Sequence, residues 1–400
     1  MREIITFIHN LFPAEFHSQV ALAGGTVRDI LLGKESQDID LVAALPHDDL
    51  LALGFRLVEA SSSATIYFKH NHNFGKIEVT RINNMDELED DLRRRDFTVN
   101  AIAMTLDGSI VDLLKGYDDL TATRLQVCSG ETFSNDPLRI FRGFRFECDG
   151  WRMTPETESL IQLHDWSAAF CAMPIERFSN EMLKAQSGKT PERFFERMIE
   201  LSVGNEFLPE LFKMPLIPAG PLEHHPEGDL FTHSVQVLQR VAATTGDPLA
   251  RFCAFFHDLG KLATDPALYP IHHGHDDAGF KMAGDFCNRL RLPATYRKTL
   301  AWISSLHGKA NKWDELRKST KVRVAEQAIK AGIVLILPLV SAADKHGTQP
   351  IAEWEDAVRV AAMNTRDLGI DQEKLETMPI VNRPSYILQK RVDLLRNGGV

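Results

Sequence analysis

The spacing of hydrophobic residues changes about one third of the way along the chain. Before residue 126, short apolar runs typical of strands, such as 66–68 and 76–82, alternate with short helical segments. Beyond it, apolar residues recur at helical spacing, as in 138–145 and 178–183. The pattern predicts an α+β amino-terminal part followed by an all-α remainder.

Proline and glycine are concentrated at residues 214–226, which marks the clearest boundary within the helical part. Together with the change in hydrophobic spacing, this boundary divides the chain into successive segments. We expect an α+β segment at 1–125 and three helical segments at 126–215, 216–347 and 348–400.

Composition narrows the class of protein. Of the 400 residues, 44% are hydrophobic, which is enough for several cores. No apolar run approaches the roughly 20 residues that cross a membrane, and residues 1–8 do not resemble a secretory signal. The five scattered cysteines form no C-x-x-C pair and are typical of reduced thiols in a cytoplasmic protein. A net charge of −10 argues against nonspecific binding of polyanions, so nucleic acid must contact local basic clusters such as 93–95.

The first candidate site combines a glycine turn with two acidic residues. Gly24 and Gly25 allow backbone N–H groups to approach a phosphate closely, and Arg28 adds a cationic fork. Asp38 and Asp40 are two apart on an expected strand, so both carboxylates face one side. A pair of glycines alone is more often an ordinary turn, and an Asp-x-Asp pair alone is more often a solvated strand edge. Together they predict a Mg²⁺-dependent phosphoryl or nucleotidyl transfer centre.

The second motif, at residues 93–101, begins with a run of arginines. Asp96 and Asn100 are four apart, which on a helix would place both side chains on one face. A carboxylate and an amide there can share a ribose hydroxyl, while the arginines neutralise phosphates. The alternative is an exposed, charged start of a helix.

A third motif places Asp136, Arg139 and Arg142 at intervals of three residues. We expect one helical stripe that carries a carboxylate acceptor beside a guanidinium donor. Such a pair matches the Watson–Crick edge of cytosine or adenine, each of which has an amine next to an acceptor nitrogen. The alternative is an ordinary Asp–Arg pair within a helix, which contributes about 0.2–0.5 kcal/mol.

A second candidate metal site lies in the expected helical segment 216–347. His257 and Asp258 are adjacent in sequence and can both face one ion at a helix bend, with His233 and Asp344 completing the set of ligands. Polar ligands within the apolar run 255–261 are costly to bury unless they are satisfied. A core histidine bonded to a carbonyl would explain one of these residues but not all of them.

Six motifs occur in a fixed order: G-G-x-V-R-D at 24–29, D-x-D at 38–40, R-R-D-F-T-x-N-A at 94–101, G-Y-D-D-L at 116–120, D-P-L-R-x-x-R at 136–142 and E-R-x-x-x-E at 176–181. This set resembles the bacterial class II tRNA nucleotidyltransferases, the CCA-adding enzymes and their poly(A) polymerase relatives. The resemblance implies a polymerase-beta-like head followed by neck, body and tail. It also implies transfer of CMP and AMP from CTP and ATP to the 3′ end of tRNA, with release of pyrophosphate.

The resemblance also implies a role for each matched residue. It assigns triphosphate binding to Gly25 and Arg28, Mg²⁺ to Asp38 and Asp40, nucleotide contact to Arg95, the ribose to Asp96 and Asn100, base selection to Asp136 and Arg139, phosphates to Arg142, and support of the neck helices to Glu176, Arg177 and Glu181. Glu78, on an expected neighbouring strand, is a candidate third carboxylate near the metal.

The histidine-rich body resembles an HD-type phosphohydrolase domain. That resemblance assigns a second divalent metal, of unspecified identity, to His233, His257, Asp258 and Asp344. His272, His273 and His307 are candidates for a further metal or for phosphate. The implied chemistry is hydrolysis of a phosphate ester, for example a 2′,3′-cyclic phosphate at a damaged tRNA end.

The sequence departs from the family in the short connection after Glu78, at residues 80–86. Complete CCA-adding members carry a longer flexible segment there. A nucleotide pocket that changes shape between addition of C and addition of A needs such a mobile segment. An enzyme that adds only C is therefore an alternative, although loop lengths vary freely. The poly(A) polymerase branch is disfavoured because its basic segment after the first D-x-D motif is not found.

Two further functions remain open at this point. The chain can be a metal-dependent phosphohydrolase whose amino-terminal part binds tRNA without catalysis, or a structural tRNA-binding protein with two inactive centres. The second is disfavoured because no expected acidic ligand is missing. The sequence predicts tRNA, CTP and ATP as partners and no membrane; it specifies no oligomeric state.

Overall fold

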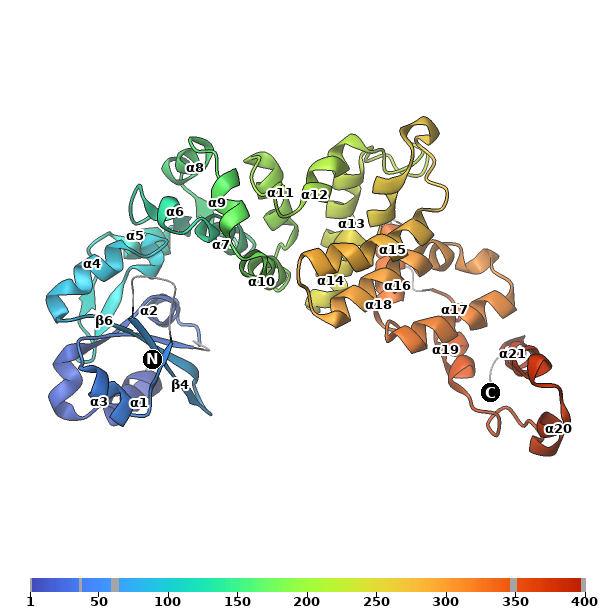
Figure 1. Cartoon of the computed structure of the whole chain (residues 1–400), viewed down its shortest axis with the longest axis horizontal. Helices are drawn as coiled ribbons and strands as arrows, with labels where there is room; N and C mark the ends of the chain where they lie inside the picture. The colour runs from blue at the N-terminus through green and yellow to red at the C-terminus, as the bar shows by residue number, and fades with distance from the viewer. Residues whose placement is uncertain (1, 36–37, 59–64, 346–350, 397–400) are drawn as a thin grey trace. The chain divides into compact units, whose positions relative to one another are not determined.

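The computed structural model describes residues 2–35, 38–58, 65–345 and 351–396. Contacts within the chain define two compact units, Met1–Trp166 and Ser167–Val400. The first contains a large sheet with helices, and the second is helical (Figure 1). The boundary expected at residue 347 lies outside the described residues.

A mixed seven-stranded sheet forms the centre of the amino-terminal unit, in the order β3-β4-β5-β2-β1-β6-β7. β2 and β5 are parallel, and the other neighbouring strands are antiparallel. The strands are β1 (Val20–Ala23), β2 (Ile39–Ala43), β3 (Arg56–Val58), β4 (Thr65–Asn71), β5 (Gly75–Arg81), β6 (Ala103–Thr105) and β7 (Ile110–Val111).

Helices cover both faces of this sheet. The helices of the unit are α1 (Arg2–Leu11), α2 (Gly25–Leu31), α3 (His47–Ala52), α4 (Leu88–Arg93), α5 (Gly116–Thr121), α6 (Thr132–Asn135), α7 (Leu138–Glu147) and α8 (Pro155–Gln162). One core cluster joins α1, α2 and α3 to the sheet, and a second joins α4 to the opposite face (Figure 1).

The alternation of side chains along β2 places the acidic residues. Ile39 and Leu41 are buried in the core beneath α1, α2 and α3. Val42 packs on the opposite face, in the cluster with α4. Successive residues of a strand point to opposite faces, so Asp40 shares the face of Val42.

A short parallel pair lies outside the main sheet. β8 (Arg124–Leu125) pairs with β9 (Arg152–Met153), so strand structure extends beyond residue 126, where we expected helices alone. The reason is local: the loop after α7 returns the chain to the edge that β8 offers. Apart from this pair, the described chain after residue 126 is helix and connecting loop, and the predicted α+β and helical parts are confirmed.

The carboxy-terminal unit is built of helices around an aromatic core that includes Phe178, Phe195, Phe207 and Phe255. Its helices are α9 (Ser167–Ala172), α10 (Ile175–Ala185), α11 (Glu192–Glu200), α12 (Pro209–Lys213), α13 (Leu230–Thr244), α14 (Pro248–Phe256), α15 (His275–Arg289), α16 (Ala294–Asn311), α17 (Lys318–Ala331), α18 (Ile336–Asp344), α19 (Trp354–Ala362), α20 (Gln372–Thr377) and α21 (Arg383–Arg396).

None of the helices within the described ranges has both the length and the apolar character that a membrane span requires. The five cysteines are free thiols, of which Cys148, Cys253 and Cys287 are buried. Burial raises the pKa of Cys287 to about 12, so this thiol stays protonated at neutral pH.

The G-Y-D-D-L motif positions the short 3₁₀ helix η3 (Thr98–Asn100). Asp119 accepts a hydrogen bond of 2.7 Å from the Thr98 hydroxyl. A Cβ at Gly116 would lie 2.2 Å from the Thr98 carbonyl oxygen, so only glycine allows this approach of α5.

Gly116→Ala should therefore destabilise the amino-terminal unit by about 1–3 kcal/mol, because the new methyl group must displace backbone. Urea unfolding of the full chain measures the change. Gly130→Ala is the matched control, since nothing lies within 4 Å of a Cβ at that position, and it should change the unfolding free energy by less than about 0.5 kcal/mol. Equal effects of the two substitutions would contradict the packing argument.

Candidate active sites

The start of β2 and the first turn of α2 hold the first candidate site. The Gly25 N–H donates a hydrogen bond of 3.2 Å to Asp40 Oδ2. The Thr26 hydroxyl accepts a bond of 2.7 Å from the Asp40 N–H and donates one of 3.2 Å to the Asp38 carbonyl oxygen. The glycine turn and the acidic pair are therefore one connected structure, as the sequence predicted.

Parallel pairing with β5 brings a third carboxylate beside the pair. Glu78 is the register partner of Asp40, and Lys76 donates its backbone N–H to Asp38 Oδ1 at 3.1 Å. The Lys76 ammonium lies 2.5 Å from Glu78 Oε2. We call Asp38, Asp40 and Glu78 the head carboxylates.

The head carboxylates repel one another electrostatically. Burial, followed by the charges of Glu78 and Asp38, raises the pKa of Asp40, although Arg95 and the Gly25 N–H oppose the rise. A divalent cation would relieve this repulsion, and hard carboxylate oxygens are the ligands that Mg²⁺ prefers. The residues present therefore fit a magnesium site.

A continuous chain of hydrogen bonds links the basic motifs. Arg28 Nη1 donates to Asn100 Oδ1 at 2.7 Å, and Asn100 Nδ2 donates to Asp96 Oδ1 at 2.9 Å. Arg142 contacts Asp96 Oδ2 through Nε and Nη2, each at 2.8 Å. Three sequence motifs thus meet in one network, which orients their polar groups together.

Asp96 is the most buried member of this network. Burial alone would raise its pKa, but the Arg142 charge, the Asn100 amide and the Phe97 N–H hold the pKa of Asp96 well below its usual range. The prediction that Asp96 and Asn100 share a helix face is wrong. Asp96 precedes η3, and a turn followed by 3₁₀ geometry brings the two side chains together.

Arg95 and Arg139 are also anchored. Arg95 contacts Asp91 Oδ2 through Nε at 3.1 Å and Nη2 at 2.9 Å. Arg139 donates to the carbonyl oxygens of Arg94, at 2.7 Å, and of Arg95, at 3.3 Å. These contacts fix the Arg139 guanidinium against the segment that carries the arginine run.

Asp136 lies just before α7 rather than within it, so the prediction of a single helical stripe is wrong for this residue. Its Oδ1 accepts a bond of 3.2 Å from the Leu138 N–H at the start of the helix. Arg139 and Arg142 follow on the helix itself. The proline at 137 explains the difference, because it disfavours helical geometry in the residue before it.

The E-R-x-x-x-E motif lies in the carboxy-terminal unit, on α10. Glu181 is buried, and Glu176 lies 3.3 Å from Arg291 Nε. Their expected role in supporting helices stays a prediction.

Three helices bring together what we call the histidine–aspartate centre: His233 on α13, His257 and Asp258 just after α14, and Asp344 at the end of α18. All four side chains are buried. His233 Nε2 lies 3.0 Å from Asp344 Oδ1, and His257 Nε2 lies 3.2 Å from Asp258 Oδ2. The predicted helix bend is present, since α14 ends at Phe256 and a 3₁₀ turn, η5 (Leu259–Ala263), follows.

The outer nitrogen of each histidine is already engaged. His257 Nδ1 lies 2.8 Å from the Ala254 carbonyl oxygen, and His233 Nδ1 lies 2.6 Å from Glu227 Oε1. These acceptors require a proton on Nδ1, which leaves the lone pair of a neutral imidazole on Nε2. Both lone pairs therefore face carboxylate oxygens.

Lone pairs and carboxylates repel each other unless a cation lies among them. His233 Nε2, His257 Nε2 and Asp258 Oδ1 are buried and make no hydrogen bond within the described part of the chain. Burial lowers the pKa of His257, but the charges of Asp258 and Asp344 outweigh it and raise the pKa to about 10. The centre requires positive charge, and two imidazoles with two carboxylates fit a divalent transition metal.

Glu227 is a residue that the sequence analysis missed. Its Oε1 lies between His233 Nδ1 and His225 Nδ1, at 2.6 and 3.0 Å. Despite burial, these histidines lower the pKa of Glu227 to about 2. A carboxylate on the outer nitrogen orients a metal-binding histidine, but no pattern in the sequence before α13 indicates this contact.

The other histidines divide into two groups. His307 and His275 lie with Nε2 at 3.2 and 3.5 Å from Asp258 Oδ1. His272 instead contacts the Pro218 carbonyl oxygen at 2.7 Å, and His273 is exposed. The structure thus brings His307 to the centre as expected, and His275 takes the place expected for His272 or His273.

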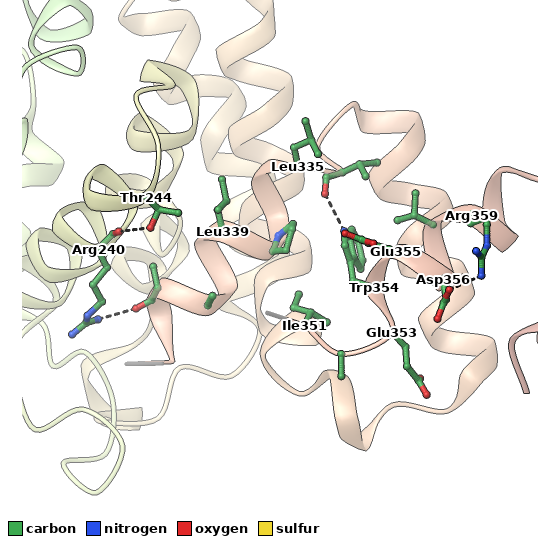
Figure 2. Close-up of a pocket in the computed structure, with 16 residues that line it drawn as sticks. Arg240, Thr244, Leu335, Leu339, Ile351, Glu353, Trp354, Glu355, Asp356 and Arg359 are labelled. Carbon is green, nitrogen blue, oxygen red and sulfur yellow. Dashed lines mark hydrogen bonds and ion pairs between the residues drawn. The ribbon is translucent and has the colours of Figure 1, made fainter. Parts of the chain in front are cut away.

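A cavity of about 1040 Å³ lies among α13, α18 and α19, with mainly apolar walls that include Leu339 and Trp354 (Figure 2). Arg240 donates to the Ala343 carbonyl oxygen at 2.8 Å, and Trp354 Nε1 donates to that of Val334 at 3.0 Å. Among the described residues that line it, none belongs to the histidine–aspartate centre. The cavity offers apolar surface rather than reactive groups.

Two family models match the chain: Poly A polymerase head domain at residues 55–126, and HD domain at residues 230–337. A "Multifunctional CCA protein" of Methylococcus capsulatus is 31% identical over 383 residues, which is 89% of this chain and 90% of the relative. A second, of Tolumonas auensis, is 31% identical over 84% of this chain and 87% of the relative.

Solved structures share the fold. A CCA-adding enzyme in apo form I superposes with a TM-score of 0.65 at 18% identity, over 100% of this chain and 92% of the other. A CCA-adding enzyme with ATP gives 0.64 at 19% identity, over 98% and 92%. The Thermotoga maritima CCA-adding enzyme complexed with tRNA_CCA gives 0.59 at 20% identity, over 95% and 87%. At these identities the likeness concerns the fold, including the head.

Asp96→Asn should destabilise the protein by about 2 kcal/mol at pH 7, because the charged contacts with Arg142 and Asn100 are weakened. The depressed pKa of Asp96 means that this stabilisation is complete above the unfolded-state value, about 4, and fades as the pH falls below it. Urea unfolding at pH 7 and at pH 3, below that value, measures the change. Exposed Asp90→Asn is the control, and a wild-type advantage over Asp96→Asn that grows on acidification would contradict the assignment.

Proposed function

The chain belongs to the multifunctional CCA protein family, and we propose that it is a tRNA nucleotidyltransferase that synthesises and repairs the CCA end. Its substrates are CTP, ATP and the 3′ end of tRNA. The carboxy-terminal unit carries a second activity, a metal-dependent phosphohydrolase. The observation that supports this most strongly is the similarity to named relatives along nearly the whole chain.

The head carboxylates are proposed to hold Mg²⁺, chiefly through Asp38 and Asp40, with Glu78 beside them. Bound Mg²⁺ would favour deprotonation of the terminal 3′-hydroxyl and neutralise charge on the triphosphate. The protein's own contribution is to keep these oxygens on one face. Thr26 does so by bonding to the backbone on both sides of Ile39.

Arg28 and the Gly25 turn are proposed to bind the triphosphate. Arg28 is held by two neighbours, Asp29 at 2.9 Å and Asn100 at 2.7 Å, so its guanidinium is oriented before the nucleotide arrives. An arginine that is already oriented loses less freedom on binding. Arg95, which lies against the Gly24 turn, is proposed to contact the nucleotide from the other side.

Asp96 and Asn100 are proposed to bind the ribose. Asp96 stays ionised far below neutral pH, so it remains a hydrogen-bond acceptor at every pH at which the enzyme works. Arg142, paired with Asp96, is proposed to reach the phosphates. The network therefore joins ribose and phosphate recognition in one unit.

Asp136 and Arg139 are proposed to select the base. Arg139 has two of its nitrogens anchored on the backbone around Arg94 and Arg95, which fixes the direction of the remaining guanidinium edge. Selection by side chains requires such fixed donors, because a mobile donor would fit either a purine or a pyrimidine.

The histidine–aspartate centre is proposed to hold a divalent metal through His233, His257, Asp258 and Asp344. The bound metal would supply a nucleophile for hydrolysis and charge stabilisation at a phosphate ester. Glu227 keeps the His233 ring in the orientation that turns Nε2 inward. A 2′,3′-cyclic phosphate at a tRNA end is the proposed substrate, by analogy with the family.

Addition of both C and A is proposed rather than C alone. Only Ile82–Asn84 separates β5 from the 3₁₀ helix η2 (Met85–Glu87), and Ile82 is bonded to Ala43. The sequence predicted a C-only enzyme as an alternative because this connection is short, and its bond to Ala43 would limit its movement further. The relatives, however, are named as CCA proteins, which favours complete addition. The four-segment layout and a cytoplasmic location stay predictions from the sequence.

The experiment uses tRNA that lacks its CCA end, incubated with the full chain, Mg²⁺ and CTP, with or without ATP. Sequencing of the products should show CC with CTP alone and CCA with both nucleotides. Asp38→Ala should lower incorporation roughly a thousand-fold, because the magnesium site loses a ligand, while exposed Asp48→Ala should not. His257→Ala should abolish phosphatase activity on a 2′,3′-cyclic phosphate and leave CCA addition intact.

Each other outcome rejects a defined part of the proposal. Products that end in CC with both nucleotides present would establish the C-only alternative. Hydrolysis without any incorporation would make the amino-terminal unit a non-catalytic tRNA binder. Loss of both activities in His257→Ala that remains folded would reject two separate centres.

A further inference from the structure

We propose that Phe146, on α7, is a positioning residue for Arg28, the arginine proposed to bind the triphosphate. The ring of Phe146 holds the plane of the Arg28 guanidinium and thereby sets how tightly CTP and ATP bind. The inference rests on the proposed nucleotidyl transfer. It extends the nucleotide site to an aromatic residue that follows the D-P-L-R-x-x-R motif.

The Arg28 guanidinium lies over the Phe146 ring. Its Cζ atom is 5.2 Å from the ring centroid, within the roughly 6 Å over which the π electrons of a ring attract a cation. Arg28 comes from α2 and Phe146 from α7, so the contact joins the glycine turn to the helix of the third motif. A guanidinium can stack on an aromatic ring and still donate hydrogen bonds from its edges.

The hydrogen bonds of Arg28 do not fix the plane of its guanidinium by themselves. Asp29 accepts from Nε at 2.9 Å, and Asn100 accepts from Nη1 at 2.7 Å. The N–H groups of a guanidinium lie in its plane, so the group can still tilt about the line that joins these two contacts. A ring against the face opposes this tilt, and an arginine that is already oriented loses less freedom when phosphate binds.

The Phe146 ring is itself held in place. The residue is 6% exposed, and Phe97 and Trp151 pack edge to face against it, with ring centroids 6.0 and 6.1 Å away. A ring with so little exposed surface cannot stack on the base of a nucleotide, and its aromatic neighbours restrict its rotation. Phe146 can therefore affect nucleotide binding through the groups that it touches, such as Arg28.

Phe146 shares one face of α7 with two arginines of the nucleotide site. Arg139, Arg142 and Phe146 are separated by three and four residues, which is the spacing of a helix face. The two arginines contact residues 94–96, and Phe146 contacts Arg28. A single helix thus positions groups proposed to bind the base, the phosphates and, through Phe146, the triphosphate arginine.

Arg145 also lies at this ring, with its Cζ atom 4.8 Å from the centroid. It is adjacent to Phe146 in sequence, so this contact is local, whereas Arg28 reaches the ring from another element. If the ring served Arg145 alone, it would have no effect through the triphosphate arginine. The two cases differ in which arginine is energetically coupled to Phe146, and a double-mutant cycle measures that coupling.

Equilibrium binding of CTP to the full chain with Mg²⁺, in the absence of tRNA, tests the proposal. Phe146→Leu and Phe146→Met remove the π electrons but keep an apolar side chain, and each should weaken CTP binding roughly five- to tenfold. Phe146→Tyr keeps the ring and should bind CTP as wild type does. Phe12→Leu is the matched control, because Phe12 is equally buried in the core cluster on the other face of the sheet, and it should leave the affinity unchanged.

The cycle uses kcat/KM for incorporation of CMP into tRNA that lacks its CCA end, which can be measured over several decades. With Arg28→Met already present, Phe146→Leu should lower kcat/KM by less than about twofold, whereas with Arg145→Met it should keep its full effect. Equal effects of Phe146→Leu in wild type and in Arg28→Met would overturn the proposal, as would unchanged CTP affinity in both apolar variants. Failure of wild type to bind CTP would instead reject the proposed nucleotidyltransferase.

Discussion

Both sites depend on acceptor groups that the fold holds close together and that need positive charge near them to offset their mutual repulsion. In the head, burial, followed by the charges of Glu78 and Asp38, raises the pKa of Asp40. In the carboxy-terminal unit, the inward-facing Nε2 atoms of His233 and His257 meet Asp344 and Asp258. Such an arrangement opposes folding unless positive charge compensates for it. The surrounding contacts hold the acceptor groups of each site in this arrangement. They include those of Thr26 in the head and those of Glu227 in the carboxy-terminal unit.

Features that depend on local geometry could be predicted from the sequence. Strands β2 at 39–43 and β5 at 75–81, the second expected at 76–82, follow from short apolar runs, and a period of two places Asp38 and Asp40 together. Adjacent residues such as His257 and Asp258 must also lie close to one another. The fold class and the motifs of the head belong to this category, because each rests on a few consecutive residues.

Features that depend on packing between distant segments could not be predicted. His272, His273 and His275 are equivalent as a sequence pattern, and only the start of α15 decides that His275 faces Asp258. The sequence did not indicate the contact between Glu227 and His233, because the path of the loop before α13 determines which side chain Glu227 reaches. Asp96 meets Asn100 through a turn, so the spacing of four residues was informative although the inferred helix was wrong.

Calorimetry of the full chain with and without bound metal tests the requirement for a cation most directly. After chelation, verified by elemental analysis, the unfolding transition of the carboxy-terminal unit should move to lower temperature and return when a divalent metal is added, because a ligand that binds only the folded state stabilises it. A transition at the same temperature in the metal-free and metal-loaded protein would show that the buried acceptors are compatible without a cation, and would contradict the account.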